Sequence, residues 1–146
     1  MKRLSPAAIA ALMLVSISAC SQNEGATLAA PDAHAQAQSG QLTLIDIRRP
    51  DEWKQTGVAQ SALQINMVHP QGVPGFVQQV VLELEGKQDS PIGLICRTGN
   101  RTTQMQKALR EAGFTRVYNI REGMVGSSAG PGWLARGLPV EACKTC

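Results

Sequence analysis

The sequence has little net charge, few histidines and no apolar run long enough to be a confident membrane span. Its formal charge is +3, and loss of the leader predicted below would remove Lys2 and Arg3, leaving 12 basic against 11 acidic residues. This near balance gives no indication of a nucleic-acid partner. With 146 residues, of which 43% are hydrophobic and 17% charged, the chain fits one small globular domain. We expect it to act as a monomer.

The apolar stretch near the N-terminus indicates a targeting signal rather than a membrane helix. It covers residues 6–17, whereas a transmembrane helix needs ~20 apolar residues. The stretch ends in Ile17-Ser18-Ala19-Cys20, which resembles a bacterial lipobox, in which small residues precede a lipidated cysteine. We therefore predict that residues 1–19 are a lipoprotein signal peptide and that Cys20 carries the lipid. The alternative is an ordinary secretory signal cut near Ala35.

A lipidated Cys20 predicts a domain held at a membrane of the bacterial cell envelope and facing the periplasm. Residues 20–30 are small and polar and are typical of a flexible tether. Ser21, rather than an aspartate, resembles the sorting context of outer-membrane lipoproteins. Export would place the remaining cysteines in an oxidising compartment, in which disulfides persist. These cysteines are Cys96, Cys143 and Cys146. Three is an odd number, so at least one thiol stays unpaired.

Apolar patterns predict strands that alternate with helices in a domain spanning residues 31–142. This alternation is typical of an α/β fold with a central parallel β-sheet flanked by helices. Binding and catalytic sites in such sheets form at the carboxyl ends of the strands. Strands are expected at 42–47, 62–65, 92–95 and 117–120, and helices at 31–40, 73–85 and 102–112.

The segment CRTGNR, residues 96–101, lies between a predicted strand and a predicted helix. Backbone N–H groups and the positive end of the helix dipole make such a loop an anion-binding site. They also favour the reactive thiolate form of Cys96, as do the charges of Arg97 and Arg101, while Gly99 allows a tight turn. A buried core cysteine before a surface turn is the alternative. The concentration of cysteine, glycine and two arginines in six residues favours catalysis.

The histidines do not supply a catalytic partner in this interpretation. His34 and His69 each lack a neighbour in the sequence that would make a Cys/His dyad credible. We expect them to be loop or surface residues. A dyad is unnecessary if the loop itself activates Cys96.

Several segments, in order, resemble the rhodanese family of sulfurtransferases. LIDIRRPDEWKQTGVAQSA (44–62) is similar to the opening signature, CRTGNR to the active-site loop, and VYNIREGM (117–124) and GWLARGLPVE (132–141) to the closing segments. The resemblance implies a rhodanese-like α/β fold. It also implies a cysteine that carries a persulfide sulfur from a small anionic donor, such as thiosulfate, to an acceptor such as cyanide or a thiol.

The resemblance assigns roles to individual residues. Cys96 would accept the sulfur, and the loop residues after it would bind the donor. Asp46 and Arg48 match the family's Asp-x-Arg, where we expect a pair or hydrogen bonds that support the loop; a capped strand end without function is the alternative.

The family's common His-Ile-Pro-Gly-Ala segment is replaced by residues 57–62. No metal or cofactor is expected. The donor-binding residues are Arg97, Thr98, Gly99, Asn100, Arg101 and Thr102.

Three other functions are alternatives to sulfur transfer. Dual-specificity phosphatases of the cell cycle have five residues between cysteine and arginine, whereas four separate Cys96 from Arg101. A non-catalytic rhodanese module that binds a partner is a second alternative, but such modules often lack the cysteine, whereas this chain keeps Cys96. The strongest alternative is an envelope thiol-redox or sulfur-relay protein that uses Cys96 together with the tail.

The tail, residues 143–146, follows the segment at which the family's domain normally closes. A C-x-x-C pair in an exported protein can form a disulfide, whereas zinc would need two further ligands. We favour a disulfide between Cys143 and Cys146 over free thiols. When reduced, the pair could take sulfur from persulfidated Cys96 or resolve it as a disulfide; a passive clamp is the alternative.

Overall fold

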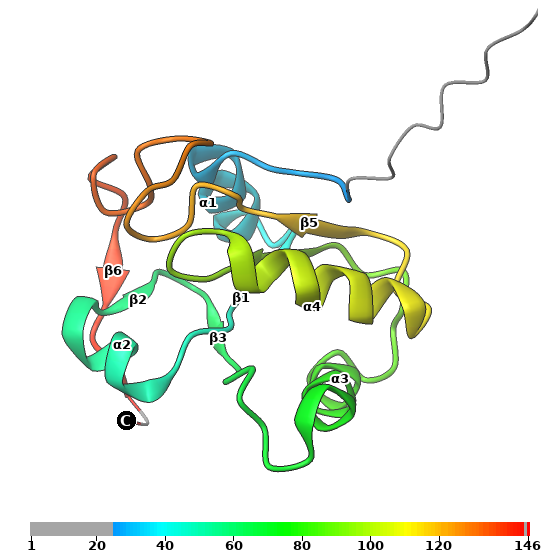
Figure 1. Ribbon diagram of the computed structural model, residues 1–146. Coiled ribbons are helices and arrows are strands. Elements are labelled where there is room, and N and C mark those ends of the chain that lie inside the picture. Colours follow the sequence, from blue (N-terminus) through cyan, green and yellow to red (C-terminus); the bar gives the residue numbers. More distant parts are fainter. Residues whose placement is uncertain (1–24, 145) are drawn as a thin grey trace, which may run out of the picture.

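The structure is a computed structural model that describes residues 25–144 and 146 (Figure 1). A four-stranded parallel sheet lies at its centre, with strand order β3-β1-β4-β5. Two further strands, β2 and β6, pair antiparallel beside it. The strands are β1 (Thr43–Asp46), β2 (Val58–Ala59), β3 (Leu63–Gln64), β4 (Ile92–Ile95), β5 (Val117–Asn119) and β6 (Val140–Glu141).

Helices cover both faces of the parallel sheet, as predicted. Side chains of α3 and α4, including Phe76 and Leu109, form one buried cluster with Ile45 and Leu94. Side chains of α1 and of the segment 120–138 form a second cluster on the other face. The helices are α1 (Ala30–Gln38), α2 (Pro50–Thr56), α3 (Gly72–Glu83) and α4 (Asn100–Glu111).

The apolar run of β1 is buried on both faces because successive side chains of a strand point in opposite directions. Leu44 belongs to the cluster under α1, and Ile45 belongs to the cluster under α3 and α4. The same alternation in β4 sends Ile95 toward the α1 side and Cys96 toward the α4 side. Cys96 therefore leaves the sheet beside the start of α4.

The predicted strands and helices agree with the structure within two residues, but three elements were not predicted. These are α2 and the short strands β2 and β6. The helix α2 begins with Pro50 at its first position, and the Glu52 carboxylate accepts the backbone N–H of Arg49 at 3.1 Å. Proline and acidic residues at this point are a helix-start signal.

The predicted tether is bound to the domain over its described part. Thr27 forms a parallel bridge with Asn119, and the backbone of Ala26 and Leu28 exchanges hydrogen bonds with Asn119 at 2.9 and 3.1 Å. The expectation of a flexible linker is therefore wrong for residues 25–30, because they supply hydrogen-bond partners to the open edge of β5. Cys20 lies outside the described residues. No helix in the described part of the chain is long and apolar enough to cross a membrane.

Candidate active site

Cys96 lies directly after β4, and its side chain has no exposed surface. The backbone N–H of Gly99 donates a hydrogen bond to its Sγ at 3.2 Å, and the Thr102 hydroxyl lies 3.7 Å from the same sulfur. The helix α4 begins at Asn100, two residues earlier than predicted. The N-terminus of α4, with its unpaired N–H groups and positive dipole end, thus belongs to the loop that holds Cys96.

The hydroxyl of Thr102 connects the loop to β5. It lies 2.7 Å from the carbonyl oxygen of Gly99 and 2.7 Å from Oδ1 of Asn119, whose Nδ2 donates to the hydroxyl of Thr103 at 3.0 Å. Sequence analysis missed Asn119, although a buried asparagine in an otherwise apolar strand is a signal that polar groups must be satisfied there. These bonds fix the first turn of α4 against the sheet.

The backbone of the segment 121–125 packs against the loop and fixes its shape. Met124 and Val125 donate backbone hydrogen bonds to the carbonyl oxygens of Cys96 and Arg97 at 2.9 and 3.1 Å. Gly123 has a φ of +64°, and a Cβ at this position would meet the carbonyl of Arg97. This close approach explains why position 123 is a glycine.

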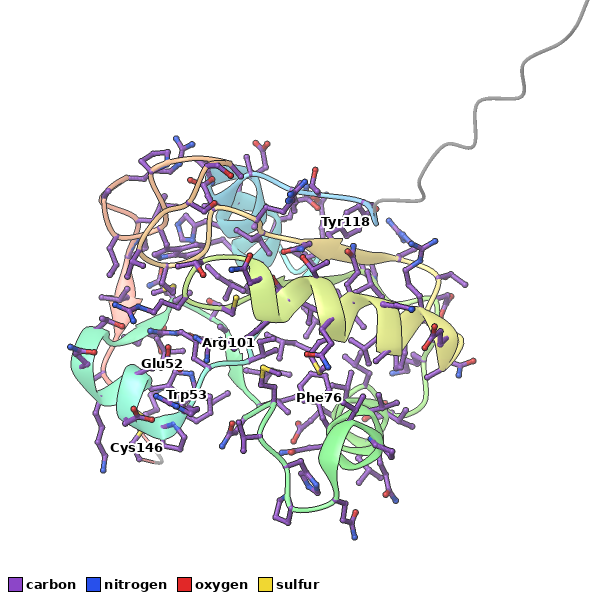
Figure 2. The ribbon with its side chains drawn as sticks, viewed as in Figure 1. Glu52, Trp53, Phe76, Arg101, Tyr118 and Cys146 are labelled. Atoms are coloured by element: carbon purple, nitrogen blue, oxygen red, sulfur yellow. A yellow bond between two sulfur atoms is a disulfide. The ribbon has the colours of Figure 1, made fainter. Side chains whose placement is uncertain are left out.

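Arg101 is paired with Glu52, a residue of α2 that sequence analysis did not select. Two guanidinium nitrogens of Arg101 donate to the two carboxylate oxygens, both at 2.6 Å (Figure 2). The side chains are 29% and 12% exposed. The hydrogen bonds from Arg101 lower the pKa of Glu52 to about 2, although partial burial opposes the shift.

This ion pair gives Arg101 a structural role besides the donor-binding role that the sequence predicts. Its positive charge is balanced by Glu52, and the hydrogen bonds from the guanidinium to this carboxylate raise the pKa of Arg101. Arg97 is the exposed arginine of the loop, and within the described chain it has no ion-pair partner. The loop therefore presents Arg97 to solvent and uses Arg101 to connect α4 with α2.

Asp46 and Arg48 form the expected pair at the end of β1. Both side chains are buried, and three N–H···O contacts between them measure 2.7 to 3.1 Å. Arg48 also donates to the Thr56 hydroxyl and to the Gly57 carbonyl, each at 2.7 Å. The pair fixes the end of α2 to the sheet. It supports the loop indirectly, because Glu52 of α2 contacts Arg101 of the loop.

The contacts of the two histidines are with residues other than Cys96. The ring of His34 packs edge-on against Trp133, with ring centroids 5.5 Å apart, and Nδ1 of His69 accepts the backbone N–H of Gln71. Within residues 25–144 and 146, no group of three or more histidine, cysteine or acidic side chains is arranged to hold a metal ion.

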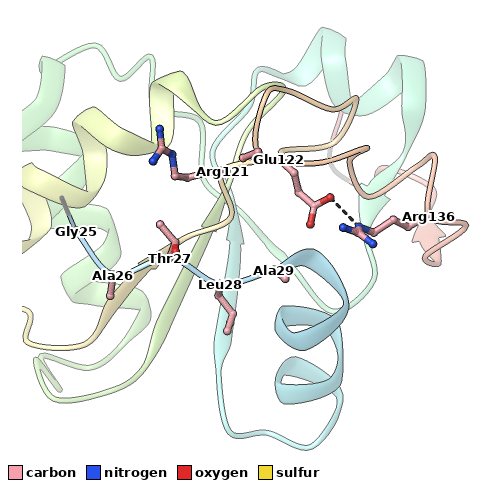
Figure 3. A pocket seen from close by; sticks show the side chains of 9 residues that line it. Gly25, Ala26, Thr27, Leu28, Ala29, Arg121, Glu122 and Arg136 are labelled. Carbon is pink, nitrogen blue, oxygen red and sulfur yellow. Dashed lines mark hydrogen bonds and ion pairs between the residues drawn. The ribbon is translucent and has the colours of Figure 1, made fainter.

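A cavity of about 590 Å³ lies beside the N-terminal segment rather than at Cys96 (Figure 3). The buried carboxylate of Glu122 accepts hydrogen bonds from Arg136 at 2.7 Å and from the backbone of Ala30 and Gly132. Burial raises the pKa of Glu122, but these hydrogen bonds together outweigh it and lower the pKa. Glu122 therefore fixes the start of α1. The lining residues are 25–29, Arg121, Glu122, Ala129 and Arg136.

The tail forms the disulfide that the C-x-x-C spacing predicts. Cys143 and Cys146 are bonded, with their Cα atoms 5.8 Å apart. The side-chain amide of Gln64, at the carboxyl end of β3, donates to Sγ of Cys143 at 2.9 Å. Cys146 is exposed, and Cys143 lines a pocket together with Trp53 of α2; Figure 2 labels Cys146 and Trp53. The free cysteine of the described chain is Cys96.

Comparisons with known proteins agree with the predicted family. A family model of the Rhodanese-like domain matches residues 29–129. A sulfurtransferase of Allochromatium vinosum is 30% identical over 106 residues, which are 73% of this chain and 84% of that protein. A tRNA uridine(34) hydroxylase of Legionella pneumophila is 26% identical over 72% of this chain, but the chain spans only 40% of its length.

A solved structure shows the same fold. The polysulfide-sulfur transferase homodimer of Wolinella succinogenes has a TM-score of 0.56 and 26% sequence identity, and the match covers 84% of this chain and 82% of that chain. The α/β architecture with a central parallel sheet is thus shared with a sulfur-transferring protein.

Proposed function

Because this chain belongs to the rhodanese-like domain family, which includes sulfurtransferases, we propose that it transfers a sulfane sulfur through a persulfide on Cys96. The donor is a small anion such as thiosulfate, and the acceptor is a thiophilic molecule such as cyanide or a thiol. One observation carries the proposal: Sγ of Cys96 accepts the N–H of Gly99 in a loop that opens directly into α4.

The chemistry consists of two displacements at sulfur. The thiolate of Cys96 attacks the outer sulfur of thiosulfate, the S–S bond breaks, and sulfite leaves with the bonding electron pair. The acceptor then attacks the outer sulfur of the persulfide, and Cys96 leaves as a thiolate. The N–H of Gly99 and the dipole of α4 stabilise negative charge on the cysteine sulfur at both ends of this cycle.

The surroundings of Cys96 favour a small donor. Since Cys96 exposes no surface, a donor reaches Sγ only when loop atoms shift, and a small anion requires the smallest shift. The exposed guanidinium of Arg97 attracts that anion to the loop. A phosphate monoester is bulkier, and its binding by Arg101 would require both guanidinium nitrogens to leave Glu52.

The decisive test uses the purified domain with thiosulfate and cyanide. We expect thiocyanate formation by the wild type and none by Cys96→Ser, with an unchanged circular dichroism spectrum. Cys143→Ser/Cys146→Ser, which leaves Cys96 in place, is the matched control and should keep the activity. Substantial turnover by Cys96→Ser would overturn the assignment of Cys96.

We also propose that Cys20 anchors the protein in a membrane of the bacterial cell envelope, with the domain facing the periplasm. The support is the Ile17-Ser18-Ala19-Cys20 pattern after an apolar stretch. Ser21 favours the outer membrane. Only residues 21–25 separate Cys20 from Ala26, whose carbonyl accepts the backbone N–H of Asn119, so the anchor would hold the β5 edge near the lipid.

A further inference from the structure

We propose that the Cys143–Cys146 pair is a second reactive site that, when reduced, takes the sulfane sulfur from Cys96 and releases it as sulfide. This inference rests on the proposed persulfide at Cys96. The disulfide seen in the structure is then the product of the reaction, and an external protein dithiol restores the reduced pair.

The strand β6, which precedes the tail, is fixed to the domain near β4, the strand that Cys96 follows. The strand β6 pairs with β2, with Val140 opposite Ala59, and the backbone N–H of Gln60 donates to the Pro139 carbonyl at 3.1 Å. Ala59 lies in the same buried cluster as Ile95, the residue before Cys96. Ala59 and Ile95 lie on the α1 side of the sheet, whereas the side chain of Cys96 points to the α4 side, so the tail leaves the domain from a rigid position near β4 and must pass the carboxyl end of the sheet to reach Cys96.

The disulfide also lies at the carboxyl end of the parallel sheet, where Cys96 follows β4. Its Cys143 sulfur contacts the amide of Gln64, which is in register with Asp46, and Asp46 is in register with Ile95. Two interstrand spacings separate Gln64 from Ile95, about 10 Å between Cα atoms. Figure 1 shows the C-terminus beside α2, whose Glu52 contacts the active-site loop.

The two cysteines differ in reach and exposure. Cys143 is two residues from Glu141 and is partly buried, whereas Cys146 is exposed and lies five residues from the end of β6. With Cys143 held at Gln64, the three residues from Cys143 to Cys146 span about 10 Å when extended, which equals the separation across the two interstrand spacings from Gln64 to Ile95. Once the disulfide opens, Cys146 can reach the loop, while Cys143 stays near Gln64. Exposed disulfides are also the more easily exchanged ones.

These positions assign an order of steps. The Cys146 thiolate attacks the outer sulfur of the Cys96 persulfide, that S–S bond breaks, and Cys96 leaves as a thiolate. The Cys143 thiolate then attacks Sγ of Cys146, closes the disulfide and expels hydrosulfide. The sulfane sulfur gains two electrons and the two tail thiols lose two, so the reaction balances without another oxidant.

A single-turnover experiment tests the inference. The wild-type domain is reduced with a dithiol, freed of reductant under anaerobic conditions and treated with thiosulfate. We expect one sulfide per chain, together with formation of the Cys143–Cys146 disulfide in the mass spectrum. Cys146→Ser should stop at the Cys96 persulfide, and Cys96→Ser should release no sulfide.

Transfer within one chain also predicts how mixed variants behave. A tethered thiol has an effective concentration in the mM range, so at about 10 μM protein a mixture of Cys96→Ser with Cys143→Ser/Cys146→Ser should release sulfide about 100-fold more slowly than the wild type. Equal sulfide release by Cys146→Ser and wild type, or a tail that stays reduced, would overturn the inference. If wild type makes thiocyanate, such a failure concerns the tail alone; absence of thiocyanate would instead reject the proposed function.

Discussion

At the scale of single residues, the site is organised by paired charges. Arg101 pairs with Glu52, and Arg48 pairs with Asp46, so neither arginine offers a free charge to a donor. The sulfur of Cys96 is instead contacted by a backbone N–H. Arg101 and Arg48 thus position the loop and α2, and Arg97 is the residue available to attract an anion.

The Glu52–Arg101 pair predicts a pH-dependent part of the stability. The pKa of Glu52 is lowered from 4.5 to about 2 by Arg101, so its contribution is fully present above pH 4.5 and is lost as the pH falls toward 2. With allowance for solvent screening, we expect this contribution to be about 1–2 kcal/mol. Urea unfolding at pH 6 and at pH 2.5 measures it.

The comparison that isolates this effect is Glu52→Gln against Glu83→Gln, which changes an exposed carboxylate of α3. Glu52→Gln should be less stable than the wild type at pH 6 and approach it at low pH, while Glu83→Gln should follow the wild type throughout. A constant difference between Glu52→Gln and wild type across this range would contradict the assigned pair.

Removal of Arg101 should change the selectivity among donors. Arg101→Ala leaves the carboxylate of Glu52 without its partner beside the loop, and its negative charge repels anions. We expect kcat/KM with thiosulfate to fall about tenfold more than with an uncharged sulfane-sulfur donor such as an organic trisulfide, a difference of about 1.4 kcal/mol. Adding Glu52→Gln should restore most of this selectivity. Equal losses with both donors would show that Arg101 has only a structural role.

At the scale of elements, the alternation of strands and helices could be predicted from apolar periodicity, and so could the position of Cys96 after β4. The contacts of Arg101 could not, because Glu52 is 49 residues away in the sequence and belongs to a short helix whose start signal was overlooked. The strands β2 and β6 have only two residues each, too short for any periodic pattern. Their pairing is set by contacts between distant segments.

The packing of the loop against the segment after β5 predicts the effect of Gly123→Ala. A Cβ would meet the carbonyl of Arg97, and the left-handed backbone adds about 1 kcal/mol of strain. Gly40→Ala is the matched control because Gly40 has a φ of +71° and no heavy atom within 4 Å of the added Cβ. Gly123→Ala should lose more stability than Gly40→Ala, and it alone should lower thiocyanate formation.

The comparison of these two variants separates backbone strain from close packing. Chemical denaturation gives the free energy of unfolding of each, and the cyanide assay gives the activity. Similar losses of stability in both variants, with activity retained, would mean that the loop tolerates movement of residues 121–125.

At the scale of the whole molecule, the two ends of the described chain are both bound to the domain. Residues 25–28 extend along β5, and the tail is held at β2 and Gln64. The N-terminal segment thereby joins the proposed membrane anchor to the sheet edge farthest from β3 in the strand order. The tail holds Cys143 and Cys146 at the carboxyl end of the parallel sheet, where Cys96 also lies.

Membrane attachment is tested by Cys20→Ala in the native envelope. Because a lipidated cysteine would be the anchor once residues 1–19 are removed, we expect the variant to appear in the soluble periplasmic fraction or to remain unprocessed. Ser21→Asp is the companion variant and should move the protein to the inner membrane. A Cys20→Ala protein that sediments with membranes as completely as the wild type would contradict the anchor.

The persulfide on Cys96 is the central claim, and mass spectrometry of the domain after treatment with thiosulfate tests it most directly. To exclude the proposed tail reaction, the measurement uses the domain with its Cys143–Cys146 disulfide intact. We predict that the peptide containing Cys96 gains the mass of one sulfur atom and loses it again when cyanide is added, with thiocyanate as the product. An unmodified Cys96 peptide, or an added sulfur that cyanide does not remove, would contradict the account.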